Sequence, residues 1–324
     1  MAVGEMSAHR DGRGRDAMRP GEIPAKGWVD VAVRVRTALG AHRVSLLAAG
    51  VALFGLLAAF PALAAIVSIY GLFASPADVA GHLQSLSGVI PADALEIVRN
   101  QLSDVASQQS TALGFGVALS LLVALWSTRK GIVALMMACN AAYGETERRG
   151  FFTKIGVSMG LTFGAIVYFI VALTIGAAVP LAAEALFQND ILVGLANAVR
   201  WVLLWLFVVF GLAVIYRYAP SRTRARWRWV SWGSAMAATL WIAGSLLFEL
   251  YVRNFGSYGE TYGALAGAVV LLLWLYLSAF FVILGAEINA ELEHQTERDS
   301  TIGPEAPLGE RGAYVADTVG EARR

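Results

Sequence analysis

Lysine and arginine are distributed unevenly along this chain, and their distribution constrains its fold more than any other feature. Six long apolar stretches leave seven connecting pieces, which carry 8, 1, 5, 0, 5, 1 and 4 basic residues in chain order, with Arg217 counted in the fifth. Arg200, inside a stretch, completes the total of 25. Cytoplasmic loops of membrane proteins collect Lys and Arg. The alternation therefore predicts six transmembrane spans in an inner-membrane type protein, with the N- and C-termini in the cytoplasm.

Composition supports a membrane protein and argues against several other classes. The chain is 57% hydrophobic and 15% charged, with a mean hydropathy of +0.60, whereas a soluble domain is about 25% charged. A net charge of +1 gives no general attraction to nucleic acid. The single cysteine, Cys139, excludes an internal disulfide, and no pair of the four histidines has metal-ligand spacing. We therefore expect no metal site, no nuclease and no other enzyme.

The apolar stretches predict an all-α, polytopic membrane fold with short interfacial and external helices. The six spans are placed at about residues 44–72, 111–127, 155–179, 191–218, 230–252 and 264–288. The second span ends before Arg129 and Lys130, because each cation would cost roughly 2.5–3.5 kcal/mol in the hydrocarbon. Residues 131–143 then continue as a helix at the cytoplasmic boundary. The alternative is a helix that re-enters the protein interior, with Arg129 lining a cavity.

Polar segments flank this six-span membrane domain, which covers residues 28–295. Residues 1–27 are predicted to be a disordered cytoplasmic tail, and residues 296–324 a polar, mostly disordered cytoplasmic tail. Apolar residues at helical spacing from Trp28 to Leu39 predict a short helix in the headgroup region. The alternative is an N-terminal extension of the first span. Turn signals within residues 73–110 predict a small external helical hairpin.

Glycine and proline mark two places where helices could pack closely or bend. Gly156, Gly160 and Gly164 recur every four residues and predict a groove on one face of the third span. Packing within the chain is the favoured use of this groove, and a homo-oligomer contact is the alternative. In the first span, Pro61 removes a helix hydrogen bond and is a candidate hinge.

Several short motifs resemble one family of membrane proteins. They are Phe60-Pro61, Trp126-Ser127, Tyr216-Arg217-Tyr218-Ala219-Pro220, Tyr262-Gly263, Trp274-Leu275-Tyr276 and Gly285-Ala286-Glu287-Ile288-Asn289-Ala290-Glu291. Through them, residues 28–295 are similar to the YihY/BrkB family. The resemblance implies a six-span protein of the bacterial inner membrane. Some members of the family are linked to serum resistance, and others are candidates for envelope lipid transport. We read the family's older label, ribonuclease BN, as a misassignment.

Ionisable groups inside a membrane are costly, so the few present are candidates for a transport pathway. Arg200 and Glu249 lie at the same predicted outer level and would form an outer gate pair. Arg129 and Glu287 would form an inner pair, with Asn289 beside Glu287. An anion could exchange with the carboxylate at each arginine, which would offset the desolvation of an unpaired charge.

Each candidate also has a purely structural interpretation. Arg200 can reach the outer headgroups, and Glu249 can pair with Arg253 four residues on. Glu287 can face the arginine-rich loop at residues 217–228. Tryptophans interleaved in that loop could stack on RNA bases, but anionic lipid is the simpler partner for a basic loop at a membrane.

Two functional classes follow from these features. The first is a transporter or flippase that moves an amphiphilic, anionic envelope lipid, and the alternative is a non-transporting envelope assembly or structural factor. No Gly-x4-Gly-Lys-Ser/Thr phosphate-binding loop occurs, so no nucleotide cofactor is expected. The expected partners are membrane lipids and envelope proteins, without nucleic acid, and a homo-oligomer is an open alternative.

Reporter fusions can check the predicted topology. Fusions at Ser85, Asn189 and Ser257 should report the external side, and fusions at Gly144 and Ala225 should report the cytoplasm, because the basic loops are held inside. A cytoplasmic signal from Ser85 would contradict the orientation at its first step.

Overall fold

Helices make up the regular structure of the chain. The computed structural model describes residues 12–73, 113–186, 189–254 and 264–322, and these residues contain no strand. The predicted all-α fold class is therefore confirmed. One isolated β-bridge joins Ala225 to Thr301. The helices are η1 (Pro20–Glu22), α1 (Ala25–Ala41), α2 (Val44–Phe73), α5 (Leu113–Ala142), α6 (Phe151–Leu186), α7 (Asp190–Tyr218), α8 (Trp227–Asn254), α10 (Ala264–Glu293) and α11 (Tyr314–Asp317).

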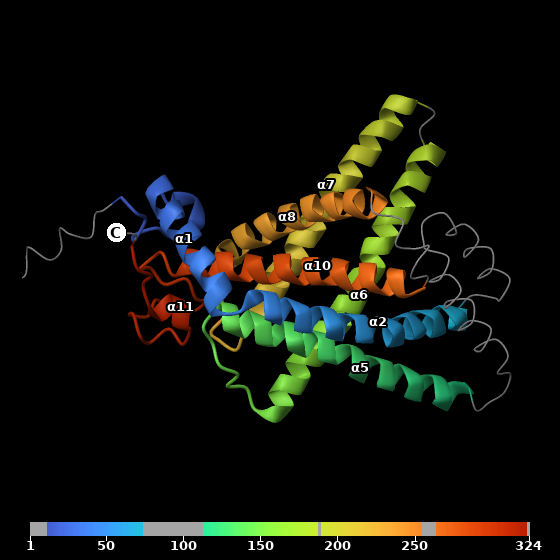
Figure 1. Cartoon of the computed structure of the whole chain (residues 1–324), viewed down its shortest axis with the longest axis horizontal. Coiled ribbons are helices and arrows are strands. Elements are labelled where there is room, and N and C mark those ends of the chain that lie inside the picture. The colour runs from blue at the N-terminus through green and yellow to red at the C-terminus, as the bar shows by residue number, and fades with distance from the viewer. Residues whose placement is uncertain (1–11, 74–112, 187–188, 255–263, 323–324) are drawn as a thin grey trace, which may run out of the picture.

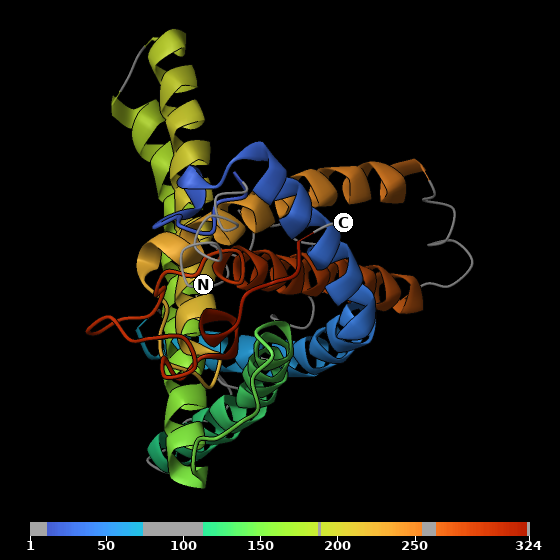
Figure 2. The same ribbon diagram turned by 90° about the vertical axis from the view of Figure 1, so that its left-hand side faces the viewer.

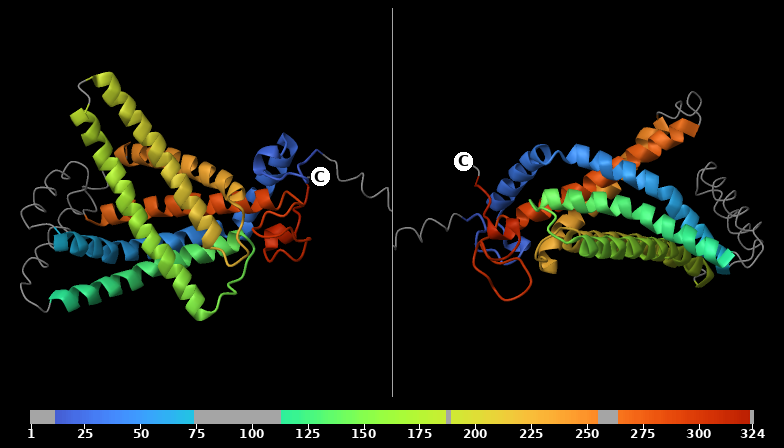
Figure 3. Two further views of the ribbon diagram at one scale, coloured as in Figure 1. Left: turned by 180° about the vertical axis from the view of Figure 1, so that it is seen from behind. Right: turned by 90° about the horizontal axis from the view of Figure 1, so that it is seen from below.

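The long helices form two groups that cross each other. α2, α5, α8 and α10 run along the long axis of the molecule, and α10 packs against both α2 and α8 (Figure 1). α6 and α7 form an antiparallel pair that crosses this group obliquely, as the view from behind shows (Figure 3, left). The pair is attached through α5 on one side and α8 on the other. The space between the two groups is where the candidate site lies.

The positions of the spans follow the apolar stretches of the sequence. Within the described residues, four helical segments are long and apolar enough to cross a membrane: Phe151–Ala172, Ile191–Tyr218, Trp227–Arg253 and Gly267–Glu293. The bent pair Ala25–Ala41 and Val44–Ala58 would make a fifth if it is one span. The last three of the four coincide closely with the predicted spans at 191–218, 230–252 and 264–288. The total of six spans stays a prediction.

A sharp elbow separates α1 from α2. The two helices meet at 63°, and Arg43, between them, adopts a left-handed backbone conformation with φ of 51°. That conformation ends one helix before the next begins. α1 is thus a helix of its own, as predicted, and not an extension of α2. Its buried residues Asp30, Val31 and Val35 lie on the side that packs against α10.

The ends of α2 and α5 match the sequence in part. α5 continues without interruption to Ala142, so residues 131–142 extend the second apolar helix as predicted. Gly144, with φ of 64°, supplies the left-handed turn that stops it. α2 runs through position 61 to Phe73 and is curved (Figure 3, right). The predicted external hairpin at 73–110 lies outside the described residues, apart from its first residue.

Two glycines allow a close contact between α8 and α10. A Cβ on Gly233 would collide with the carbonyl oxygen of Gly285, and a Cβ on Gly285 would collide with the hydroxyl of Tyr216. That hydroxyl donates to the carbonyl oxygen of Val282 at 2.7 Å. Glycine is therefore required at both positions, because only a helix face without side chains allows the backbones to approach this far.

The two polar ends of the chain differ from the predicted disorder over residues 12–27 and 296–322. They pack together as a cap over one end of α8 and α10, which faces the viewer in Figure 2. The Thr296 hydroxyl donates to the carbonyl oxygen of Ala17 at 2.7 Å, and the Gln295 amide donates to that of Arg13 at 2.8 Å. Side chains that satisfy backbone carbonyls give order here where apolar residues are few. The physical cause of the difference is hydrogen bonding, which composition does not report.

Arg311 holds the C-terminal part of this cap together, and replacing Arg311 should lower the stability of that part. The buried guanidinium donates to the carbonyl oxygens of Ala306, Ala316 and Glu297 at 3.0, 2.6 and 2.8 Å. Arg311→Ala leaves these acceptors unpaired, so the local free energy of opening should fall by about 2–3 kcal/mol. Hydrogen exchange of residues 305–320 measures this. The matched variant is Arg298→Ala, because Arg298 is exposed; equal exchange in both variants would contradict the assignment.

Candidate functional site

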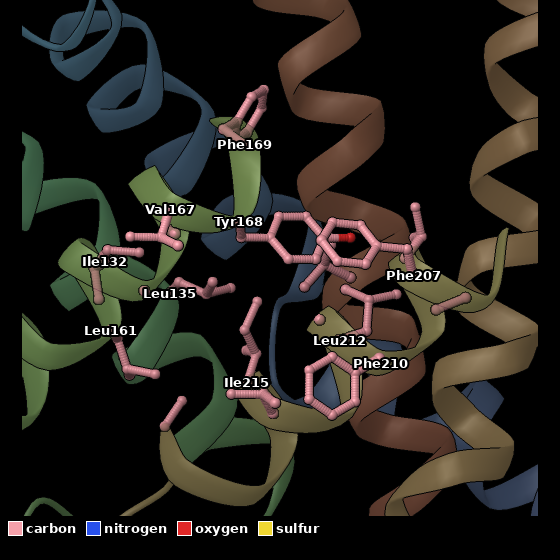
Figure 4. A pocket seen from close by; sticks show the side chains of 18 of the residues that line it. Ile132, Leu135, Leu161, Val167, Tyr168, Phe169, Phe207, Phe210, Leu212 and Ile215 are labelled. Atoms are coloured by element: carbon pink, nitrogen blue, oxygen red, sulfur yellow. The ribbon is translucent and has the colours of Figure 1, made fainter. Parts of the chain in front are cut away.

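An apolar cavity of ≈ 560 Å³ lies between the α6–α7 pair and the other long helices. Its volume is within the range of ligand pockets, about 300–1,000 Å³. Figure 4 shows Leu135 and Leu161 on one side of it and Phe210 and Ile215 on the other. Its walls come from five helices and include Ile132, Leu135 and Met136 of α5, Leu161 and Tyr168 of α6, Phe207, Phe210 and Ile215 of α7, Trp241 of α8 and Val282 of α10. The cavity can therefore hold hydrocarbon but offers little to a polar ligand.

Tyr168 of α6 closes one side of the cavity by resting on α7. Its ring stacks on Phe207 with the centroids 4.2 Å apart and the planes 6° from parallel, as Figure 4 shows. One turn along α7, Gly211 lacks the Cβ that would lie 2.7 Å from the Tyr168 ring. Aromatic stacking and a glycine opposite it together set the spacing of α6 and α7 at this level.

The glycine groove of α6 is open and does not pack against another helix. A Cβ built on Gly156, Gly160 or Gly164 would meet nothing within 4 Å. Gly160 and Gly164 instead line the cavity. This corrects the expectation of ordinary packing within the chain: the groove was predicted, but the space in front of it stays empty because α7 is held off by the bulky Tyr168–Phe207 stack.

A group of basic and aromatic side chains lies at one end of the cavity, and we call Arg217, Tyr218, Arg224 and Trp227 the basic rim. Phe210, a wall residue, stacks on Trp227 with centroids 6.3 Å apart. The Arg217 guanidinium lies 4.6 Å from the centre of the Trp227 ring, and that of Arg224 lies 4.9 Å from the centre of the Tyr218 ring. The apolar wall of the cavity is thus connected, through the Phe210–Trp227 stack, to the positively charged side chain of Arg217.

Neither arginine of the basic rim forms an ion pair with a carboxylate in the described parts of the chain. Arg217 donates one hydrogen bond to the carbonyl oxygen of Ala225, and its buried Nε has no partner. Arg224 is exposed. Two guanidinium groups without a protein anion make this end of the cavity suited to an anionic group, which arginine binds through paired hydrogen bonds.

Arg129 lies beside the cavity, between α5 and α6. Its Nε donates to the Ser158 hydroxyl at 2.6 Å, and its guanidinium lies 4.8 Å from the centre of the Trp126 ring. Ile132, one turn on, is a wall residue. Arg129 is half-buried, whereas Lys130 is exposed. Arg129 therefore binds the neighbouring helix α6 and is not among the residues that line the cavity. In the described part of the chain, the predicted pair of Arg129 with Glu287 does not form, because the hydrogen-bond partner of Arg129 is Ser158.

The predicted outer pair has other contacts. Glu249 forms an ion pair of 2.7 Å with Arg253, and their side chains are 54% and 75% exposed. This agrees with the structural interpretation of an exposed contact four residues apart. Arg200 is half-buried on α7, with its guanidinium 5.3 Å from the centre of the Trp201 ring. A pathway role for these groups stays a prediction.

Glu287 is buried near the C-terminal end of α10 and pairs with a residue that sequence reasoning missed. Its Oε1 lies 2.8 Å from Nδ1 of His42, in the elbow between α1 and α2. The neighbouring Glu291 pairs with Arg34 of α1 at 2.5 Å. The predicted partners of Glu287 were Arg129 and the arginine-rich loop, and the structure corrects its partner to His42 at the N-terminal side of the chain.

Asn289 is buried and joins α10 to the start of α8. Its Oδ1 accepts from the backbone N–H of Gly233 at 2.8 Å, and its Nδ2 donates to the carbonyl oxygen of Val230 at 3.1 Å. A Cβ on Gly233 would lie 2.5 Å from the Asn289 side chain. These bonds join the Asn289 amide to backbone groups in the first two turns of α8. The geometry gives Asn289 a structural role in this contact.

The arginine-rich loop supplies one buried ion pair of its own. Arg222 and Glu293 lie 2.7 Å apart, with side chains 2% and 0% exposed. Burial disfavours the charged guanidinium, but the Glu293 carboxylate outweighs it and raises the pKa of Arg222. The sequence predicted Glu287 as the acidic residue that faces this loop, whereas in the structure Glu293, six residues later, pairs with Arg222 of the loop. Among the described residues, no three metal-ligating side chains gather in one place.

Comparisons with known proteins agree on a family. Residues 35–309 match the family model described as virulence factor BrkB. A putative ribonuclease-like protein, YfkH, of Bacillus subtilis is 32% identical over 250 residues, which cover 75% of this chain and 88% of that protein. The UPF0761 membrane protein VP0125 of Vibrio parahaemolyticus is 29% identical over 86% of this chain and 88% of its own. No solved structure matches.

Gly211→Ala should disturb the cavity through Tyr168. The new Cβ would lie 2.7 Å from the Tyr168 ring, so we expect a loss of about 1–3 kcal/mol from overpacking, measured by thermal unfolding in detergent. Gly194→Ala is the matched control on the same helix, because its Cβ would meet nothing within 4 Å. In a Tyr168→Ala background the cost of Gly211→Ala should largely disappear; an unchanged cost would show that the tyrosine is not the cause.

Proposed function

The chain belongs to the virulence factor BrkB family, and from that premise we propose that it binds an anionic, amphiphilic envelope lipid and moves it across the membrane. The observation that carries the proposal is the continuity of the apolar cavity with the basic rim. Its two ends suit the two parts of one molecule: hydrocarbon chains in the cavity, and an anionic headgroup at Arg217 and Arg224.

The cavity supports a hydrocarbon occupant because its wall is apolar. The side chains that line its ≈ 560 Å³ are almost all aliphatic or aromatic, so they offer dispersion contacts and few hydrogen-bonding groups. An acyl chain that enters from the bilayer core exchanges one apolar environment for another.

The headgroup, and not the acyl chain, should then determine which lipids are bound. Because the bilayer core is as apolar as the cavity, moving a chain between them provides no hydrophobic driving force. The guanidinium groups of Arg217 and Arg224 favour a phosphate or carboxylate over a neutral headgroup. Trp227 and Tyr218 fix their positions through contacts of 4.6 and 4.9 Å. The expected substrate class is therefore an amphiphile with a net negative headgroup.

The open glycine face supports movement of such a molecule along α6. Gly160 and Gly164 give a wall without side chains, along which a chain can slide without displacing protein atoms. Arg129, held by Ser158, stands beside this face and offers a second cation. In this proposal the anion passes between Arg129 and the basic rim. Pro61 stays a candidate hinge in α2, which packs against α5 and α10, two of the helices that form the cavity wall.

Filling the cavity should stop transport without unfolding the protein. In vesicles of neutral lipid with a fluorescent phosphatidylglycerol, we expect the protein to speed lipid exchange between leaflets, and Gly164→Leu to reduce this at least about tenfold, because the leucine would occupy the chain site. Arg224→Gln should have a similar effect on the anionic probe, since Arg224 is exposed and its loss removes headgroup charge. The measurement is quenching of the probe in the outer leaflet.

Matched controls separate the site from general damage. Gly194→Leu also extends into open space on α7, and Arg253→Gln also removes an exposed cation; both should leave the exchange rate unchanged. A neutral phosphatidylcholine probe should respond to Gly164→Leu but not to Arg224→Gln. If Gly164→Leu and Arg224→Gln accumulate normally and fully replace the wild-type gene in cells, the transport proposal fails. The envelope assembly factor is then the better description.

A further inference from the structure

A buried carboxylate near the C-terminal end of α10 is paired with a residue that reaches solvent. The side chain of Glu287 is 1% exposed, and that of His42 is 33% exposed. Glu287 Oε1 lies 2.8 Å from His42 Nδ1. The imidazole therefore stands between the carboxylate and the solvent, and its Nε2 is the ring nitrogen that remains available to a proton from outside.

The carboxylate is poorly compensated in its surroundings. Glu287 Oε2 is buried and has no hydrogen-bond partner. The pair adjoins an apolar cluster in the chain: Ile283 lies one turn before Glu287 on α10, Val44 lies two residues after His42, and both belong to one buried hydrophobic cluster. A carboxylate in such a place normally accepts several hydrogen bonds or meets a full positive charge. With a neutral imidazole, Glu287 has one hydrogen bond and no cation.

Other titratable groups near the pair do not supply that cation. From α10, Glu291 adds a second negative charge, but Arg34 of α1 pairs with it at 2.5 Å. From α5, the buried thiol of Cys139 lies close enough to feel the Glu287 charge. Arg43 follows His42 in the elbow, is exposed, and forms no ion pair with a described carboxylate. The positive charge that Glu287 needs can therefore come from His42 itself.

We propose that His42 and Glu287 form a proton-binding site, in which one proton from solvent binds Nε2 of His42. Before uptake, a neutral imidazole donates its Nδ1–H to the Glu287 carboxylate, and the pair has a net charge of −1. After uptake, the imidazolium and the carboxylate form a neutral ion pair. No other bond forms or breaks. The inference extends beyond lipid binding, because it assigns a proton to a site outside the cavity.

The proton should control how firmly α1 is docked. His42 is the residue after α1, and its partner Glu287 belongs to α10. The ion pair therefore holds the elbow between α1 and α2 against the C-terminal end of α10. The hydrogen bond to Glu287 raises the pKa of His42, against the opposing effect of burial. A raised pKa means that this stabilisation is complete below the unfolded value of about 6.5 and is lost as the pH rises through the folded value. Docking of α1 should weaken toward alkaline pH.

The small number of histidines makes the titration of His42 directly measurable. The chain has four histidines, so ¹⁵N-histidine labelling of the full-length protein gives few ring signals, and His42→Gln identifies the one required. We expect the His42 midpoint above that of an unstructured peptide. In Glu287→Gln it should fall by about 1 pH unit or more, a tenfold loss of proton affinity, because the opposite charge is removed. Glu249→Gln, which removes an exposed carboxylate, should leave it unchanged.

A second readout follows the docking of α1 and does not depend on transport. Hydrogen exchange of residues 28–40, compared between wild type and Glu287→Gln across pH 6 to 9, should show a loss of protection with rising pH only in the wild type. If Glu287→Gln does not fold, the wild-type titration decides alone. A His42 midpoint at or below the peptide value, or an imidazole that stays neutral throughout, would overturn the proposal. So would equal midpoints in wild type and folded Glu287→Gln.

Discussion

Buried carboxylates need cations, and this requirement organises the part of the molecule around the C-terminal end of α10. The last two turns of α10 carry three carboxylates that pair with segments distant in sequence. The pairs are Glu287 with His42, Glu291 with Arg34, and Glu293 with Arg222. Removing one partner of a buried pair costs about 3–5 kcal/mol, because it leaves an uncompensated charge. The elbow, α1 and the loop after α7 must therefore dock at the same helix end for α10 to keep its acidic residues inside.

The other half of the structure depends on weaker contacts, and the cavity lies there. α6 meets α7 through the Tyr168–Phe207 stack and meets α5 through the Arg129–Ser158 hydrogen bond. Within a bilayer, apolar helix faces have no hydrophobic reason to close on each other. A bulky stack next to a row of glycines therefore leaves a gap, and lipid can fill it. By contrast, Gly233 and Gly285 let α8 and α10 close completely, with Asn289 bonded across the contact.

The sequence predicted what depends on local pattern and missed what depends on partners far along the chain. Apolar length and charge placed α7, α8 and α10 within a few residues, because those properties are local. The pairing of Glu287 with His42 spans 245 residues, and neither residue has a pattern that marks the other. The order of residues 296–322 was missed because Arg311 and Thr296 supply it by bonding backbone carbonyls, whereas composition counts only apolar side chains. The glycine row on α6 predicted a groove, but only the position of α7 decides whether a groove is filled.

The cavity and the proposed proton site share two of their walls. On α10, Val282 lines the cavity and Glu287 follows five residues later, about 7.5 Å along the helix axis. On α5, Met136 lines the cavity and Cys139, next to the Glu287 charge, follows three residues later. A proton that changes how α1 and α10 fit together therefore acts on helices that also form the chain site. Thermodynamic linkage makes this reciprocal: if protonation of His42 changes the affinity of the cavity for an occupant by some factor, that occupant changes the proton affinity of His42 by the same factor. Coupling between the two sites thus requires that α10 has two arrangements between which both the occupant and the proton discriminate. The contacts of Glu287, Glu291 and Glu293 with His42, Arg34 and Arg222 tie the end of this helix to three segments distant in sequence, so a change of charge there changes what α10 is docked against.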